Sequence, residues 1–316
     1  MNTFPEAASR AIYEPTLRQT IIEGIGITIQ QVRQKLPYLA QEVEAWINWH
    51  SRTSEPAEYF LHPAAFPLFL LPWWAEKQVT GSRDLKFQTD LACATGNFYY
   101  YTRIVDNLMD NHPTVEQRLL PMSGYFMFQF NLVYQNYFKQ NHPFWDWCDT
   151  IWSEFCDICA KDVRLTDIDE KTFTNIVSRK CCAGKISLGA VLYRYDRLDL
   201  LEPWMKWVDL YSCWHVLQED LFDWKKDLDL HTETYILSEA KRRKKDDDLI
   251  LVWLADEGFD WAITQLGVWM WDLKKMEVAP PETQRFLDQR ETYMLGQRDR
   301  LDKGLQFISR LASLRG

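Results

Sequence analysis

A pair of aspartates stands out because both fall within one apolar, aromatic-rich segment. In "TRIVDNLMDNHP", residues 102–113, Asp106 and Asp110 are four positions apart, and the residues between them favour a helix. Side chains four positions apart on a helix are neighbours, about 5–6 Å between their Cβ atoms, so two carboxylates placed there repel each other. Such a pair either belongs to a solvated helix face or is a ligand for something positively charged.

A second acidic segment, "WHVLQEDLFDWKKDLDL" at 214–230, repeats the same spacing downstream. Glu219, Asp223 and Asp227 fall at positions i, i+4 and i+8 of the expected helix, and Asp220 lies close to that face as a weaker candidate. Each cluster should destabilise its helix unless a cation offsets the repulsion. Hard cations such as Mg²⁺ take oxygen ligands and are commonly held by carboxylates together with substrate phosphates. Two such helices could hold several Mg²⁺ ions and leave positions open for a diphosphate.

Other acidic or metal sites of helical proteins do not match this sequence. Di-iron carboxylate bundles need Glu-x-x-His on a helix, and none of the six histidines has a glutamate three residues before it. None is followed by aspartate, as a phosphohydrolase with a His-Asp dipeptide would require. HExxH, a P-loop and GxSxG are also absent from the sequence. The pattern favours Mg²⁺ held by carboxylates alone, and a solvated face stays the alternative for either motif taken by itself.

The elements that must position these residues are all expected to be helices. Alternating β patterns are scarce, whereas apolar residues recur at three- and four-residue spacing in segments such as 20–50. No Gly/Ser linker or repeat of fixed period divides the chain, so we predict one all-α domain over residues 1–316. The expected helices are 20–35, 38–51, 83–110, 115–139, 144–160, 169–194, 202–229, 247–257, 259–275 and 282–312.

Composition argues against several classes of protein. A net charge of −9 disfavours nucleic acid as a partner, because phosphate binding requires a basic face. The one dense basic run, "KRRKK" at 241–245, is followed at once by "DDD" at 246–248, so we expect a solvated segment of self-cancelling charge. The sequence shows no signal peptide and no apolar stretch that could span a bilayer. Seven cysteines, an odd number scattered through apolar segments, favour reduced thiols and a cytoplasmic protein.

The two acidic motifs resemble those of the class I isoprenoid synthase superfamily. In that superfamily, two aspartate-rich helices face each other across a deep apolar cavity of an antiparallel helical bundle and hold Mg²⁺ against a prenyl diphosphate. "IVDNLMD" and "HVLQEDLFDWKKD" are most similar to the motifs of the bacterial class IB terpene synthases, the tetraprenyl-β-curcumene synthase type. They are more distantly similar to those of squalene and phytoene synthases. The sequence departs from the family's pattern at Lys225 and Lys226, in the middle of the second motif.

The resemblance implies two sets of carboxylate ligands for several Mg²⁺ ions. Asp106 and Asp110 would form the first set. Asp223 and Asp227 would form the second, with Glu219 as a supporting ligand. The four aspartates would then also be the catalytic residues.

Basic residues between the two motifs are candidates for binding the diphosphate. The segment "NIVSRKCCAGKISLGAVLYRY" at 175–195 combines small residues, which would weaken or kink a helix, with Arg179, Lys180 and Lys185. In the resembling family, a kinked helix in this region borders the cavity and its basic side chains meet the diphosphate. The alternative is close helix packing at the small residues, with the basic side chains extending to water.

Three further groups of side chains have candidate roles near the substrate. Arg103 could contact the diphosphate or simply pair with Asp106, three residues later. Tyr235 resembles the position at which such enzymes close a loop over the diphosphate. Aromatic residues upstream of the first motif could line the cavity and stabilise carbocations through their ring faces, namely Phe98, Tyr99 and Tyr100.

The predicted function is that of a Mg²⁺-dependent terpene synthase, a carbon–oxygen lyase acting on a linear prenyl diphosphate. Mg²⁺ and basic residues would neutralise the diphosphate as the allylic C–O bond ionises, and the carbocation would cyclise in a water-excluded pocket. One alternative is a prenyltransferase or a head-to-head coupling enzyme of the squalene and phytoene synthase type. Another is a non-catalytic helical protein that binds a lipid or a partner protein. We expect a monomer or homodimer, and peripheral contact with a membrane would be compatible with long substrates.

Overall fold

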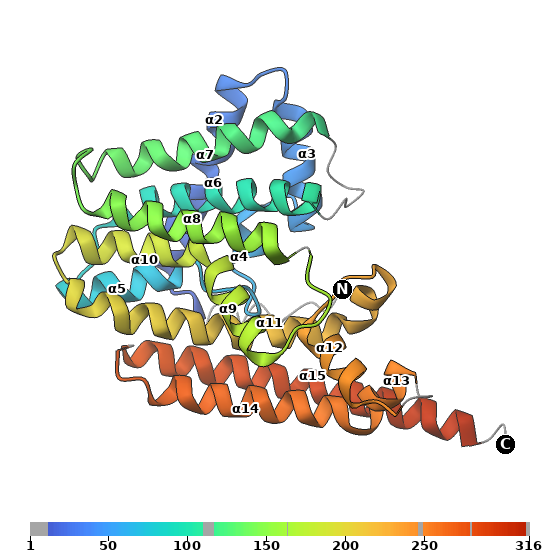
Figure 1. Ribbon diagram of the computed structural model, residues 1–316. Helices are drawn as coiled ribbons and strands as arrows, with labels where there is room; N and C mark the ends of the chain where they lie inside the picture. The colour runs from blue at the N-terminus through green and yellow to red at the C-terminus, as the bar shows by residue number, and fades with distance from the viewer. Residues whose placement is uncertain (1–11, 110–116, 163, 246–248, 279, 314–316) are drawn as a thin grey trace. The chain divides into compact units, whose positions relative to one another are not determined.

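The computed structural model confirms the all-α prediction (Figure 1). No strand occurs among the residues that it describes, which are 12–109, 117–162, 164–245, 249–278 and 280–313. The chain divides into two compact units. Unit 1 comprises Met1–Asp157 and Cys181–Met205, and unit 2 comprises Ile158–Lys180 and Lys206–Gly316. The predicted single domain and its deep apolar cavity stay predictions.

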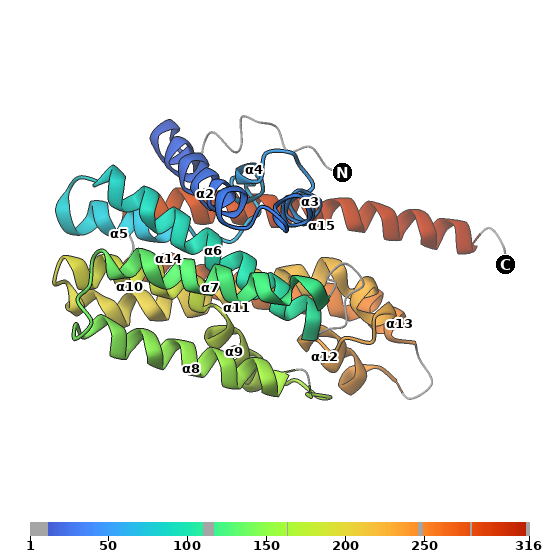
Figure 2. The ribbon, with the colours of Figure 1, turned by 90° about the horizontal axis from the view of Figure 1, so that it is seen from above.

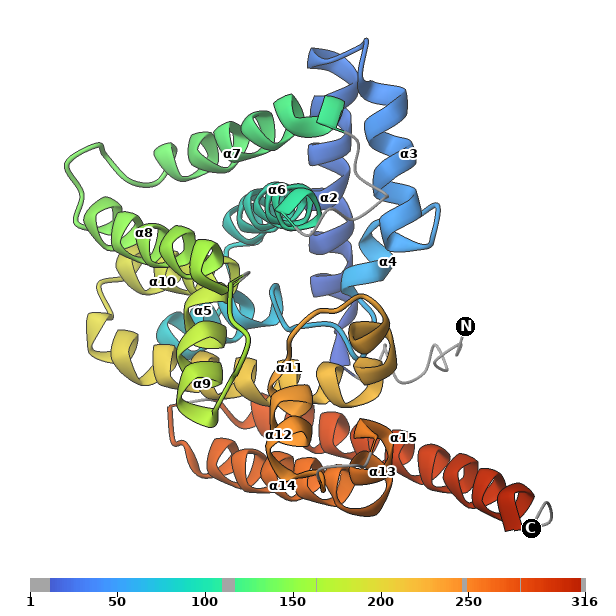
Figure 3. The same ribbon diagram turned by 45° about the vertical axis from the view of Figure 1, so that its right-hand side comes forward.

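Unit 1 is built around α6 (Leu85–Met109), the helix that carries Asp106. Helices α2 (Pro15–Lys35) and α7 (Leu120–Gln135) pack against α6, as Figure 3 shows, and α3 and α4 pack against α2 (Figure 2). The remaining elements of this unit are α3 (Ala40–Ser51), α4 (Ala57–Phe60), α5 (Leu70–Thr80), η1 (Gln117–Leu119), most of α8 (Phe144–Asp162), α10 (Cys182–Arg194), η2 (Leu198–Leu200) and the first residues of α11 (Leu201–Asp229).

The contact between α2 and α6 is close because a glycine stands at the crossing. A Cβ atom at Gly24 would lie 2.5 Å from Cβ of Ala92 and 2.9 Å from the backbone nitrogen of Cys93, so no larger residue fits without displacement. A buried hydrogen bond reinforces the contact, since Asn97 Nδ2 donates to Thr28 Oγ1 at 3.1 Å. Close packing and this buried hydrogen bond together fix the position of α6 against α2.

Unit 2 contains most of α11, the helix that carries the second acidic motif. Helices α14 (Phe259–Lys275) and α15 (Pro281–Ser313) lie side by side (Figure 1). Ring contacts between Tyr211 and Phe286, 5.5 Å between centroids, join α11 to α15. The remaining elements are the end of α8, α9 (Glu170–Lys180), α12 (Tyr235–Arg243), α13 (Ile250–Trp253) and the π-helical turn η3 (Leu254–Gly258).

Three differences between the structure and the expected elements have a clear local cause. Helix α5 falls between the expected helices 38–51 and 83–110, and it tolerates Pro72 because this proline lies in its first turn, where a missing N–H costs nothing. The expected helix 169–194 is two helices, since α9 ends at Lys180 and α10 begins at Cys182. Helix α12 was not anticipated, although Thr234 is a typical N-cap whose Oγ1 accepts from Leu237 N at 3.4 Å.

Two further properties follow from the described residues. None of their helices has the length and apolar character needed to cross a membrane. All seven cysteines lie in the described part of the chain, and none of them is joined in a disulfide there.

Candidate functional site

The first acidic motif lies at the end of α6 in unit 1. Asp106 is half exposed, and Arg103 Nη1 donates a hydrogen bond to its Oδ2 at 3.2 Å, so the expected pairing of these two residues is present. Asp110 lies outside the described residues. Tyr99, Arg103 and Asp106 are spaced i, i+4 and i+7 on α6, which places a phenol, a guanidinium and a carboxylate along one side of the helix.

Two of the three candidate cavity aromatics are fully packed inside unit 1. Phe98 is 0% exposed, and its ring centroid lies 4.9 Å from that of Phe130. Tyr100 is 1% exposed and lies 5.5 Å from Phe126. Consecutive helical residues point in different directions, so these side chains reach different neighbours. Their role as a cavity wall stays a prediction.

Tyr99, the third candidate, belongs to a small hydrogen-bonded cluster. Its hydroxyl lies 2.8 Å from His50 Nε2 and 2.7 Å from the hydroxyl of Tyr59. Burial, together with the nearby charges of Arg103 and Arg52, lowers the pKa of His50 to about 4. Near neutral pH the imidazole is therefore uncharged, and the cluster consists of three polar aromatic rings without net charge.

The second acidic motif is the continuation of an aromatic row on α11. Its members stand at every fourth position, and neighbours in such a row touch. The rings of Trp207 and Tyr211 are stacked 5.3 Å apart at an interplanar angle of 3°, and those of Tyr211 and His215 are 6.0 Å apart at 14°. The complete row runs from buried rings to carboxylates as Trp207, Tyr211, His215, Glu219, Asp223 and Asp227.

Asp220, which the sequence ranked below its neighbours, lies at the centre of the carboxylate group. Burial raises its pKa well above the ordinary value, and the nearby charges of Asp227, Glu219, Asp162 and Asp223 raise it further. A raised carboxyl pKa means that the ionised form is disfavoured in this environment. The group is therefore short of positive charge, which a bound cation would supply.

Asp227 shows the same effect with a smaller shift. Burial raises its pKa from 3.8 to about 6; Asp223 and Glu219 contribute in the same direction, and Lys226 opposes them. Lys226 Nζ lies 4.0 Å from Asp223 Oδ2, and both side chains are mostly exposed. Lys226, which departs from the motif of the resembling family, is thus an exposed and weak partner of Asp223.

Asp162, near the end of α8, is a further member of the carboxylate group that the sequence did not single out. Lys180 Nζ donates to Asp162 Oδ2 at 2.5 Å. Lys180 ends α9, and the half-buried Arg179 directly precedes it. The structure thereby pairs one of the predicted basic residues with Asp162, whose charge in turn acts on Asp220 of α11. Asp162 was missed because it is far away in sequence and belongs to no motif.

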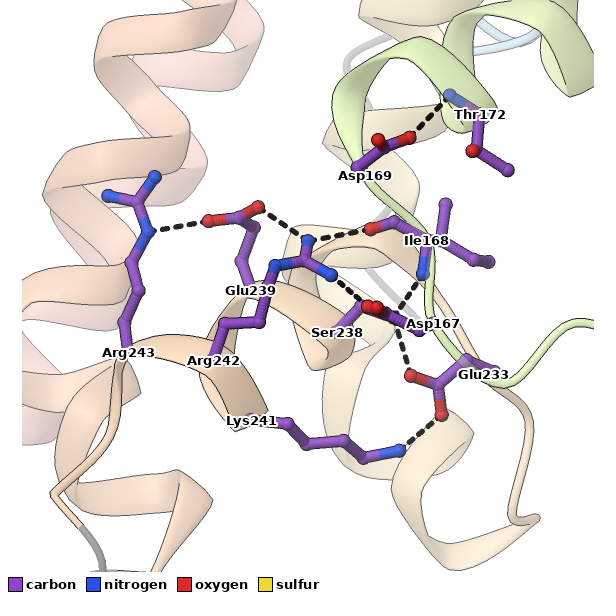
Figure 4. Close-up of polar contacts among 10 residues, drawn as sticks. All are labelled: Asp167, Ile168, Asp169, Thr172, Glu233, Ser238, Glu239, Lys241, Arg242 and Arg243. Atoms are coloured by element: carbon purple, nitrogen blue, oxygen red, sulfur yellow. Dashed lines mark hydrogen bonds and ion pairs between the residues drawn. The ribbon is translucent and has the colours of Figure 1, made fainter.

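The segment before α9 is held in place by hydrogen bonds to α12 (Figure 4). Asp169 Oδ1 accepts from Thr172 N at 2.7 Å and so caps the start of α9. Ile168 N donates to Ser238 Oγ at 2.9 Å, and Ile168 O accepts from Arg242 Nη2 at 2.7 Å. These bonds fix the start of the helix that ends in Arg179 and Lys180.

The basic run 241–245 is mostly exposed, and three of its members have carboxylate partners in unit 2. Arg242 and Arg243 both donate to the buried carboxylate of Glu239, each at 2.5 Å, and Lys241 pairs with Glu233 (Figure 4). These partners come from α12 and the turn before it. The three aspartates that follow the run lie outside the described residues. The run is therefore part of the framework of unit 2.

The small residues of α10 serve close packing in unit 1. A Cβ atom at Gly189 would lie 2.1 Å from Trp147 Cη2, and one at Gly184 would lie 3.1 Å from Leu71 Cδ1. Lys185, between them in sequence, is only 6% exposed. Close helix packing, the alternative to a kinked helix at the diphosphate, thus accounts for the two glycines. The same alternative expected the basic side chains to extend to water, and the buried Lys185 does not do so.

Tyr235, the candidate for a closing loop, is the first residue of α12. Its ring is 3% exposed and lies 4.9 Å from Phe173 and 5.3 Å from Trp261. Burial raises the pKa of its hydroxyl above the ordinary value. The residue is part of an aromatic cluster of unit 2, and a role in closing over a diphosphate stays a prediction.

No set of three or more His, Cys, Asp or Glu side chains in the described ranges is arranged as a preformed metal site. The carboxylates of α11 nevertheless suit a hard cation, because they offer oxygen donors only and repel one another in its absence. The assignment of individual ligands stays a prediction.

Solved structures show which fold these helices form. The chain matches a geranylgeranyl pyrophosphate synthetase from the archaeon Geoglobus acetivorans with a TM-score of 0.62 and 13% identity, covering 89% of this chain and 99% of that one. It matches a polyprenyl synthase from Caulobacter crescentus, complexed with calcium and isoprenyl diphosphate, with a TM-score of 0.63 and 11% identity, covering 91% and 97%. A geranylgeranyl pyrophosphate synthase matches with a TM-score of 0.54 and 14% identity, covering 88% of each chain.

No protein-family model matches the sequence, and a search of curated proteins found no match. The structural matches establish that the chain has the fold of the isoprenoid synthases. The predicted fold class is thereby confirmed.

Proposed function

We propose that this chain is a divalent-metal-dependent enzyme acting on a linear prenyl diphosphate. The observation that carries the proposal is the carboxylate group of α11, in which burial and mutual repulsion raise the pKa of Asp220 and Asp227. Its fold is that of proteins that include a polyprenyl synthase complexed with calcium and isoprenyl diphosphate. That complex supports a substrate of this class and a divalent cation for this chain.

We assign Mg²⁺ to the carboxylates of α11, namely Glu219, Asp220, Asp223 and Asp227, and to the aspartates of the first motif. Carboxylate oxygens are the protein ligands that Mg²⁺ prefers. Bound there, Mg²⁺ would stabilise the negative charge that develops on the departing diphosphate. Lys180, which is held by Asp162, would contribute a fixed positive charge to the same end.

Within this class we propose a terpene synthase, because the first motif is similar to that of the class IB enzymes. In such an enzyme, the residues of this chain's site would bind the diphosphate and exclude water. The allylic cation would then cyclise and lose a proton. A prenyltransferase is the second candidate, since the solved proteins of this fold are named as prenyl diphosphate synthases. The two reactions differ in whether one substrate suffices.

Incubation with single prenyl diphosphates from C10 to C35 and Mg²⁺ tests the proposal. A terpene synthase releases diphosphate and forms a hydrocarbon or alcohol from one substrate, which mass spectrometry detects. A prenyltransferase requires isopentenyl diphosphate or another acceptor and yields a longer product. Release of no diphosphate under either condition would leave only the non-catalytic alternative.

Two substitutions connect any activity to the assigned carboxylates. We expect Asp223→Asn and Asp106→Asn each to lower kcat/KM by about 100-fold or more, because each removes a proposed ligand of the Mg²⁺ that would stabilise the charge developing on the diphosphate. Asp229→Asn is the matched control, because Asp229 is exposed at the end of the same helix and outside the carboxylate row. Its activity should stay within about twofold of the unmodified protein, as is typical of a solvated side chain.

A further inference from the structure

A buried arginine of unit 2 contacts His215, which precedes Glu219 by one turn of α11. Arg290 of α15 is 0% exposed, and its guanidinium carbon lies 5.3 Å from the ring centroid of Trp214 and 5.9 Å from that of Tyr293. Aromatic faces offset part of the cost of burying this charge, but placing a guanidinium in a protein interior remains expensive. The polar groups that Arg290 contacts therefore bear on its role.

Arg290 determines which nitrogen of His215 carries the hydrogen. Its Nη2 lies 3.0 Å from His215 Nδ1 and donates to Gln218 Oε1 at 3.3 Å. An arginine N–H can donate but never accept, so Nδ1 of His215 must present its lone pair. The imidazole hydrogen is then on Nε2.

His215 Nε2 points toward the carboxylate row. It lies 3.5 Å from Oε1 of Glu219, one helical turn further along α11. The ring cannot turn freely, because it stacks on Tyr211 and is itself buried. The Glu219 side chain is 61% exposed, so its rotamer is not set by packing alone. An N–H directed at its carboxylate restricts the positions that this oxygen can take.

We infer that Arg290 and His215 are positioning residues that hold the Glu219 carboxylate ready to bind a divalent cation. The chain of contacts runs from Arg290 Nη2 through both nitrogens of His215 to Glu219 Oε1. Residues that orient metal ligands in this way typically change metal affinity by about 10–100-fold when they are removed. The inference rests on the proposed function, because it takes Glu219 to be a metal ligand.

Calorimetric titration of the full chain with Mg²⁺ in the presence of inorganic diphosphate tests this inference without turnover. His215→Phe keeps an aromatic ring to stack on Tyr211 but removes both nitrogens, and Arg290→Met keeps much of the side-chain length but removes the donor. We expect each variant to raise the apparent Mg²⁺ dissociation constant by about 10-fold or more. The double variant should lose no more than the more affected single variant, because both residues act through the same N–H.

Ser212→Ala provides the matched control for a merely structural effect. Ser212 is a buried polar residue of the same helix, but its Oγ donates to Val208 O, away from the carboxylates. Its Mg²⁺ affinity should match that of the unmodified protein. The melting temperature in EDTA shows whether Arg290→Met folds poorly. If it does, His215→Phe alone tests the inference, and the rise in its melting temperature on adding Mg²⁺ and diphosphate is the second measurement.

The outcomes separate this inference from the proposed function. Normal Mg²⁺ affinity in His215→Phe, alongside weakened affinity in Glu219→Gln, overturns the positioning role and leaves the proposed function standing. Normal affinity in Glu219→Gln removes Glu219 from the ligand set and overturns the inference as well, while Asp223→Asn still tests the proposed function. If the unmodified protein binds no Mg²⁺ and forms no product, the proposed function itself fails.

Discussion

Removing one carboxylate from the row on α11 should stabilise the protein when no divalent cation is bound. The perturbation is Asp227→Asn. Burial and the neighbouring carboxylates raise the pKa of Asp227 from 3.8 to about 6. The folded state therefore binds the proton more tightly than the unfolded state, so this group lowers stability as the pH rises from about 4 to about 6. Above pH 6 the destabilisation is complete, and below pH 4 it vanishes.

The magnitude follows from the two pKa values. Each pKa unit corresponds to 1.36 kcal/mol, so the difference between 3.8 and about 6 sets a ceiling of about 3 kcal/mol. Asp227 is partly exposed, and screening by solvent reduces this to about 1–2 kcal/mol. For a chain of this length, we expect Asp227→Asn to raise the melting temperature by about 2–3 °C at pH 7.5 in EDTA. At pH 4 the two proteins should melt together.

Adding Mg²⁺ with inorganic diphosphate should reverse the order of stability. A ligand at 100 times its dissociation constant stabilises the state that binds it by about 2.7 kcal/mol. The unmodified protein should gain this amount, and Asp227→Asn should gain less. Differential scanning fluorimetry at both pH values, with Asp229→Asn as control, measures each difference. A variant that melts below the unmodified protein in EDTA at pH 7.5 would refute the electrostatic reasoning.

Two further predictions concern the framework around the candidate site. Gly189→Ala places a Cβ atom 2.1 Å from Trp147 Cη2, and we expect it to lower the free energy of unfolding by about 1–3 kcal/mol, as overpacking usually does. Arg242→Ala removes a partner of the buried Glu239 carboxylate and the donor to the backbone before α9. It should cost about 1–3 kcal/mol, measured by urea denaturation.

Both predictions have controls within the same helical framework. Gly267→Ala on α14 has open space around the new Cβ atom, so it should be neutral or stabilising by up to about 1 kcal/mol. Arg243→Ala should cost less than Arg242→Ala, because the Arg243 side chain is 48% exposed against 33% for Arg242. Equal losses of unfolding free energy in Gly189→Ala and Gly267→Ala would contradict the packing argument. A larger loss in Arg243→Ala than in Arg242→Ala would contradict the hydrogen-bond argument.

Helices with a strong apolar period were predicted well from the sequence. The expected helix 259–275 is α14 to the residue, and 202–229 differs from α11 by one residue at its start. The spacing also identified the carboxylates of α11, because neighbours on a helix follow from spacing alone. The failures are local: α5 begins among prolines, and the short α12 depends on its N-cap more than on a repeated pattern.

Contacts between distant segments could not be predicted. Asp162 and Arg290 reach the neighbourhood of α11 from α8 and α15, and no spacing in the sequence connects them to it. Spacing also gave no measure of burial, which is why Asp220 ranked below Asp223 although burial raises the pKa of Asp220 well above its ordinary value. Packing between helices decides both properties, and a single sequence carries no direct record of it.

The row on α11 restricts how the length of this helix can vary. One residue inserted between His215 and Glu219 would turn every later side chain by about 100° relative to the aromatic rings before it. The carboxylates would then leave the line that begins at Trp207, and Glu219 would lose His215. Four inserted residues, about one turn, would restore the direction to within about 40° while moving the row about 6 Å along the axis. Insertions and deletions in α11 should therefore be tolerated, if at all, only in steps of whole turns.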